Sequence, residues 1–172
     1  MQMSSTHAAD TEYLVRQAAN SGYQWSSLLA PPAYMAYVVA RRGRTSLSLN
    51  KVLRATWVGG LGGSVAAGSV AYARYAYSGE DTVRVRRIKA AYNTDALRRN
   101  DHATIGGVVV GALTPAILWK RGAALNLILG GFGIGNAFGL LTHYGRAVSG
   151  DPAPKIDIAL PGAHPEVETP PS

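Results

Sequence analysis

The 172-residue sequence has no cysteine, and three long apolar segments in its middle, 55–73, 103–119 and 122–142, have no charged residue. The lack of cysteine excludes disulfides, thiolate metal sites and cysteine nucleophiles. The four histidines lie far apart, and none has the HxxxH or HExxH spacing of a metal site. No acidic or basic residue lies within the apolar segments to relay protons or bind ions, which disfavours a transporter. We therefore expect no catalytic residue, no cofactor and no metal.

The first twenty residues also lack the features of a targeting sequence. They hold one arginine and two acidic residues, and they contain no apolar core of the signal-peptide type. Secretory signals need such a core, and organellar presequences are rich in arginine and poor in acids. We expect any organellar address to be internal.

The three apolar segments are long enough for a membrane. A helix needs about 20 residues to cross a hydrocarbon core, and we predict spans over about 55–77, 103–119 and 122–143. Only Lys120 and Arg121 separate the last two, which predicts a tight helical hairpin. The expected fold class is an all-α membrane protein with three glycine-rich transmembrane helices, forming a helical membrane domain over residues 51–150.

Two flanking regions have a different composition. Residues 1–50 are polar, with a short helix expected around 10–19, and Pro31 and Pro32 are expected to block helix continuity. The aromatic segment 25–40 is either an interfacial segment or a partly buried helix. Residues 151–172 include six prolines, which predicts an extended C-terminal tail. Such a tail either lies along a partner or stays disordered.

Basic residues outnumber acidic ones, 17 to 10, and they flank the apolar segments. We therefore expect no nucleic-acid partner, and consider anionic lipids such as cardiolipin, or acidic partner subunits, instead. The polar connection 78–102 is either a solvated linker or an interfacial helix. The candidate contacts for anionic lipid or a partner are Arg84, Arg86, Arg87, Lys89, Lys120 and Arg121.

Glycine spacing indicates how the predicted spans pack. In lipid, helices associate through close backbone contact at small residues, and residues four apart share one helix face. The candidate packing residues are Gly59, Gly63, Gly68, Gly107, Gly111, Gly131, Gly135 and Gly139. Asn126 lies near the start of the third span and Asn136 lies within it, and both are expected to hydrogen-bond across helix contacts.

Three phrases of the sequence together resemble a known family. They are YLVRQAANSGYQWSSLLAPPAYMAYVVARRGR (13–44), LNKVLRATWVGGLGG (49–63) and GGVVVGALTPAILWKRGAALNLILGGFGIGNAFG (106–139). The chain resembles the fungal accessory subunit of mitochondrial respiratory complex I of the NUXM type. This resemblance implies a multi-pass protein of the mitochondrial inner membrane, packed against other membrane subunits of a large hetero-oligomeric complex. It implies a role in assembly or stability without redox chemistry of its own.

Two alternatives remain open at this stage. The Tim17/Tim22/Tim23 family of inner-membrane protein translocases also has glycine-rich spans, with an arginine and an aspartate before a GGxxxG motif. Here GGVVVG (106–111) matches that motif, but Asp95 and Arg99 stand in the reverse order, and three spans are predicted instead of four. The second alternative is a glycine-zipper pore made of several copies of the chain.

Overall fold

The computed structural model describes residues 4–154, and this part of the chain contains helices and turns but no strand. Five α-helices follow one another, with a short 3-10 turn after the first. They are α1 (Ser5–Arg42), η1 (Arg44–Ser46), α2 (Leu49–Ala76), α3 (Glu80–Ala91), α4 (Thr94–Leu118) and α5 (Ala124–Val148). The predicted all-α class is confirmed. The predicted extended tail lies outside the described residues from 155 onward.

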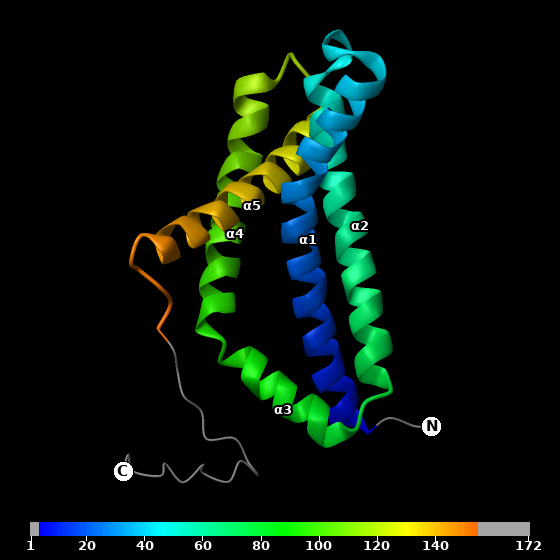
Figure 1. Cartoon of the computed structure of the whole chain (residues 1–172), viewed down its shortest axis with the longest axis vertical. Helices are drawn as coiled ribbons and strands as arrows, with labels where there is room; N and C mark the ends of the chain where they lie inside the picture. The colour runs from blue at the N-terminus through cyan, green and yellow to red at the C-terminus, as the bar shows by residue number, and fades with distance from the viewer. Residues whose placement is uncertain (1–3, 155–172) are drawn as a thin grey trace, which may run out of the picture.

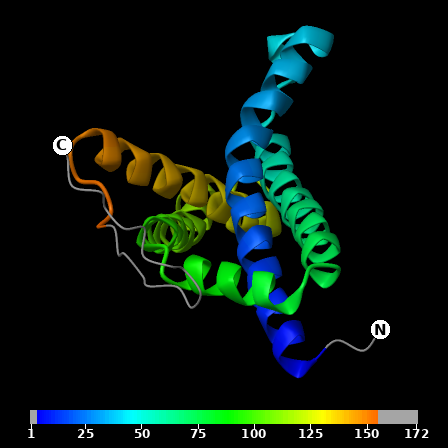
Figure 2. The same ribbon diagram turned by 60° about the horizontal axis from the view of Figure 1, so that its bottom comes forward.

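The four long helices form two pairs. α1 and α2 run antiparallel side by side, α4 and α5 form a second hairpin, and α3 joins the pairs at one end (Figure 1). α5 crosses the molecule obliquely and contacts α2 and α1 as well as α4 (Figure 2). Its fully buried Leu127 and Leu140, together with Leu53 of α2, belong to the small apolar core.

α1 overturns the prediction for the N-terminal region. It is one 38-residue helix, whereas we expected a short helix near residues 10–19 and a break at the two prolines. Ser4 caps its start, accepting a hydrogen bond from the backbone N–H of His7 (3.2 Å). Pro31 and Pro32 lie within the helix, although each removes a backbone donor and its ring crowds the preceding turn. Contacts with α2 hold the helix on the N-terminal side of the prolines, and Val38 is buried on the other side.

The connection 78–102 is helical over most of its length, and most of its residues are exposed or half-exposed. It contains the whole of α3 and the first turns of α4. Glu80 and Asp81 lie in the first turn of α3, where the helix dipole favours negative charge. Asn93 caps α4 by accepting a hydrogen bond from the N–H of Ala96 (3.0 Å). The helix expected from residue 103 therefore begins at Thr94.

The hairpin between α4 and α5 is present, with a connection over residues 119–123. Pro115 lies inside α4, as expected. The Thr114 hydroxyl donates to the carbonyl of Val110 (2.6 Å) and not to the Gly111 carbonyl that the proline leaves free. By length and composition, α4 and α5 are apolar enough to cross a membrane. α2 does not meet the same criterion, so a third span is not confirmed.

Candidate functional site: the glycine-lined helix contacts

Glycine lines the contact between α4 and α5. A Cβ added to Gly106 or to Gly135 would fall closer than 3.0 Å to the backbone of the other residue. A Cβ on Gly139 would meet the backbone of His102 and Ala103 equally closely. The glycines at this contact are Gly106, Gly107, Gly111, Gly131, Gly135 and Gly139. The two backbones therefore approach as closely as small-residue packing in lipid requires.

A second glycine-lined contact joins α1 and α2. A Cβ on Gly59 would collide with Ala30, and one on Gly63 would collide with Ser26. Gly22 of α1 faces the backbone of Gly63 in return. Gly68 is looser, since its added Cβ would lie 3.4 Å from that of Ala19. The predicted packing glycines of α2 are thus used inside the chain.

α5 has glycine on a further face, directed at α2. An added Cβ on Gly130 would lie 2.6 Å from the Cβ of Leu53, and one on Gly133 would lie 2.7 Å from Cγ2 of Thr56. Sequence reasoning missed the packing roles of Gly22, Gly60, Gly106, Gly130 and Gly133. Doublets such as Gly59-Gly60 and Gly130-Gly131 were the available signal, because adjacent residues on a helix face different neighbours.

Asn136 does not make the predicted bond across a helix contact. Its side chain is buried against Gly107, and its amide donates to the Phe132 carbonyl of its own helix (3.0 Å). Asn126, the other asparagine predicted for this role, does make cross-helix bonds. It donates to Oδ1 of Asn50 (2.9 Å) and accepts from the Trp57 indole (3.0 Å). The polar link between α2 and α5 therefore lies near the hairpin tip and not at mid-span.

A polar layer joins α1 to α4 across the molecule. Gln24 is fully buried and donates to Oδ1 of Asn100 (3.0 Å). The Arg99 guanidinium donates to the Ser21 hydroxyl (3.1 Å). Oε1 of Gln24 and Nε of Arg99 are also buried, and within residues 4–154 neither atom has a hydrogen-bond partner. This layer thus contains one buried acceptor and one buried donor that no described residue satisfies.

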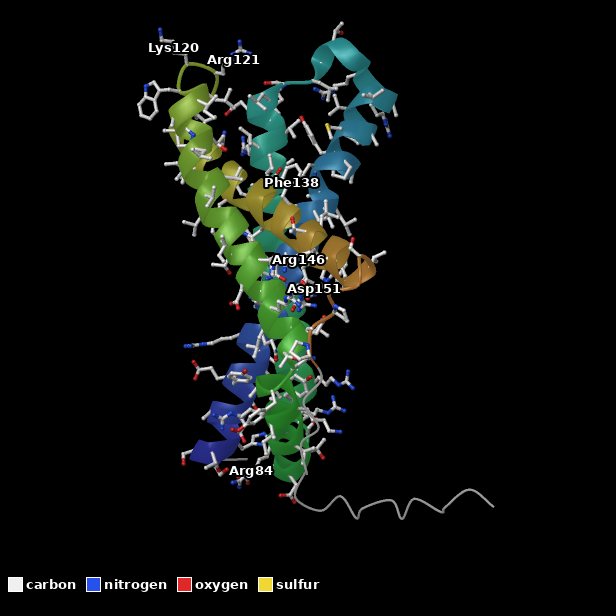
Figure 3. All side chains as sticks on the ribbon, turned by 90° about the vertical axis from the view of Figure 1, so that its left-hand side faces the viewer. Arg84, Lys120, Arg121, Phe138, Arg146 and Asp151 are labelled. Atoms are coloured by element: carbon white, nitrogen blue, oxygen red, sulfur yellow. The ribbon has the colours of Figure 1, made fainter. Side chains whose placement is uncertain are left out.

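The basic candidates separate into two groups at opposite ends of the molecule. Lys120 and Arg121 lie at the hairpin tip, and Arg84 lies at the far end with the rest of α3 (Figure 3). Two segments lie at the tip end, 41–54 and 119–123, and neither contains an acidic residue. Their basic residues are Arg41, Arg42, Arg44, Lys51, Arg54, Lys120 and Arg121. The predicted basic contacts therefore form two surfaces.

The α3 cations have different environments. Arg87 pairs with the buried carboxylate of Asp10 (2.7 Å) and lies over the Tyr13 ring. Arg86 lies over the ring of Tyr75, 5.7 Å from its centroid. Near the start of α3, hydroxyl groups of Thr6 and Ser4 donate to Glu80 and lower the pKa of its carboxyl group. α3 is thereby fastened to the first turns of α1.

A second ionic fastening holds the end of α5. Asp151 accepts from Arg98 (2.6 Å) and from Arg146 (2.7 Å), and these bonds lower the pKa of its carboxyl group. Arg146 and Asp151 lie together midway along the molecule (Figure 3). The nearby His143 is buried, and its Nε2 lies 3.1 Å from Oδ1 of Asp95. The same region thus ties α5 to the start of α4 twice.

Among the described residues, no three histidine, aspartate or glutamate side chains gather where they can hold a metal ion. No family model matches the chain, and comparison with curated proteins and with solved structures gives no match. The geometry of the site is that of a helix-packing centre, built from close backbone contacts and a few buried polar links.

Proposed function

We propose that this chain is a multi-pass membrane protein whose four long helices cross the bilayer. The supporting observation is an uncharged segment on each helix, free of Asp, Glu, Lys and Arg, over residues 17–40, 55–73, 102–119 and 122–145. At 1.5 Å per residue the shortest is about 27 Å long, against a hydrocarbon core of about 30 Å. α2, α4 and α5 are the three spans expected from sequence, and α1 adds a fourth.

Exposure of the apolar side chains supports a location of these helices in the bilayer. Only 22% of the most apolar stretch of α4 is buried inside the chain, whereas a core helix of a soluble protein is mostly buried. Its outward side chains include Ile105, Val108, Leu113 and Ile117. Val58, Leu61, Val65 and Val70 are exposed on α2 in the same way. Lipid or a partner helix must cover these faces, because so much contiguous apolar surface is unusual in a soluble monomer.

The function we propose is that of a non-catalytic accessory subunit in a larger membrane complex. The internal glycine contacts give the chain a compact helical frame, and the apolar outer faces of α2 and α4 remain available for other membrane subunits. The resemblance of the three sequence phrases assigns the complex as respiratory complex I of the mitochondrial inner membrane. In that complex the chain would support assembly or stability.

Co-purification tests this proposal. A tagged chain is extracted from mitochondria in mild detergent, separated on a native gel and identified with its partners by mass spectrometry. Migration with a large NADH-oxidising assembly is the expected result. Migration alone as a homo-oligomer would sink the subunit proposal.

The second candidate is a protein-translocase component. If all four long helices cross the bilayer, as proposed above, the chain has the four spans of that family. The reversed order of Asp95 and Arg99 still counts against it. Recovery of translocase subunits in the same co-purification would favour this candidate.

A glycine-zipper pore made of identical chains has less support. The glycine faces that would line contacts between copies, such as that of Gly131, Gly135 and Gly139, already pack inside one chain. Conductance of the purified chain in pure lipid would be the observation in its favour.

A further inference from the structure

We propose that a groove between α1, α3 and the start of α4 binds the phosphate group of an anionic phospholipid. The groove has a volume of about 500 Å³ and is open to the surface. It lies at the end of the molecule where α3 bridges the two helix pairs; Figure 1 shows this arrangement of the helices. Three cationic side chains line it, from Arg86, Lys89 and Arg99. This proposal rests on the membrane location argued above and adds a ligand to it.

The three cations are available to an anion. Within residues 4–154 none of them forms an ion pair with a carboxylate. Asp95 is the one acidic residue lining the groove, and it lies in hydrogen-bond contact with His143. Three positive charges and one negative charge leave the groove with a net positive charge. A phosphodiester carries one negative charge and several acceptor oxygens, which suits guanidinium and ammonium donors.

Arg99 is the residue most clearly prepared for a ligand. Its Nη2 donates to Ser21, which fixes the guanidinium on the wall formed by α1. Its Nε is buried and has no partner in the described chain. A buried donor without a partner carries a free-energy penalty, and a small rotation of the guanidinium toward a phosphate oxygen would relieve it.

The position of the groove along the membrane normal indicates that its ligand is a lipid and not a soluble anion. Arg99 lies three residues before the charge-free segment 102–119 of α4, and Lys120 directly follows this segment. The 18 residues of the segment make about 27 Å of helix, close to the thickness of the hydrocarbon core of about 30 Å. Arg99 therefore lies at head-group depth. The remaining walls include Leu14, Ala18 and Ala96, which offer apolar contact to the glycerol and upper acyl chains.

The other basic candidates are less suited to this role. Arg87 is paired with Asp10, and Arg84 lies outside this groove. Lys120 and Arg121 are exposed at the hairpin tip. They supply a matched control with the same charge change at the opposite end.

Lipid retention measured by native mass spectrometry tests the site. The full chain is purified from vesicles of phosphatidylcholine with a minor fraction of phosphatidylglycerol or cardiolipin. We compare wild type with Lys89→Gln/Arg99→Gln and with Lys120→Gln/Arg121→Gln. Loss of two charges at the site should lower retained anionic lipid on the order of ten-fold, because it removes two of the three charged donors that line the groove and bind the phosphate. The control pair should change it little, and retained phosphatidylcholine should not change.

Two further arms make the result decisive. Arg86→Gln/Lys89→Gln leaves the Arg99–Ser21 bond intact, so it separates lipid binding from any loss of helical structure seen by circular dichroism. Equal losses in the site and control variants would overturn the proposal, as would displacement of the lipid by inorganic phosphate. Insertion into pure phosphatidylcholine vesicles tests the membrane location by itself. A chain that inserts there but shows no preference for anionic lipid refutes the site and leaves the proposed function standing.

Discussion

Gly106 and Gly135 face each other across the α4–α5 contact, each occupying the space that a side chain on the other would need. A Cβ on either residue would meet the backbone carbonyl of its partner. The contact is reciprocal and involves main-chain atoms on both sides, so neither helix can yield by moving a side chain. This pair sets how closely the second hairpin closes.

Gly135→Ala should therefore destabilise the chain. The added methyl group forces the backbones of α4 and α5 apart, and overpacking of this kind costs about 1–3 kcal/mol. Thermal unfolding in detergent, followed by circular dichroism, measures the effect. The matched control is Gly62→Ala on α2, where an added Cβ meets nothing within 4 Å. Equal melting temperatures for the two variants would contradict the close-contact interpretation. Since the Gly135 contact is internal, impaired assembly of this variant would follow from the chain's own fold.

Arg87→Gln should loosen α3 from α1. The Asp10 side chain is only 7% exposed, so removal of its cation leaves a buried carboxylate without a charged partner. Because Arg87 itself is half exposed, we expect a loss of about 1–2 kcal/mol, below the range for a fully buried pair. Faster tryptic cleavage within α3 should accompany this loss. Arg84→Gln, at an exposed position without an ion pair in the described chain, serves as the control. Identical cleavage rates in both variants would show that Asp10 does not hold α3.

The stability of the chain should depend on pH through Asp151. Bonds from Arg98 and Arg146 lower the pKa of its carboxyl group in the folded state. The contribution is therefore complete above the unfolded pKa of about 3.9 and is lost as pH falls through the lower folded value. Asp151→Asn should melt below wild type at neutral pH, and the difference should vanish in acid. Melting curves of both proteins across this range check the sign. A difference that grows as pH falls would contradict it.

The side of the membrane on which the N-terminus lies distinguishes the four-helix arrangement from the predicted three spans. A spanning α1 places Ser5 on the same side as Asp81 and opposite Lys120. An interfacial segment over 25–40 would place Ser5 with Lys120. The chain has no native cysteine, so Ser5→Cys, Asp81→Cys and Lys120→Cys can each be labelled with an impermeant maleimide in sealed vesicles. We expect Ser5→Cys and Asp81→Cys to react together. Joint reaction of Ser5→Cys with Lys120→Cys would restore the interfacial interpretation.

Local sequence signals predicted much of the second half of the chain. The apolar segments 103–119 and 122–142 are helical, and the break at Lys120 and Arg121 is a hairpin. Both features could be predicted because they depend on neighbouring residues and not on distant contacts. Prediction was weaker where an outcome depends on contacts far along the chain. Pro31 and Pro32 indicated a break, yet α1 continues through them with its packing on α2.

The sequence by itself determined the helical class, the uncharged segments and the abundance of small residues, since composition and periodicity are properties of neighbouring residues. Only the tertiary structure decided which helix each glycine meets, that Asn126 and not Asn136 bonds across helices, and that Arg99 shares a groove with α3. These pairings join residues tens of positions apart. They are fixed by how closely whole helices approach, which no local pattern encodes.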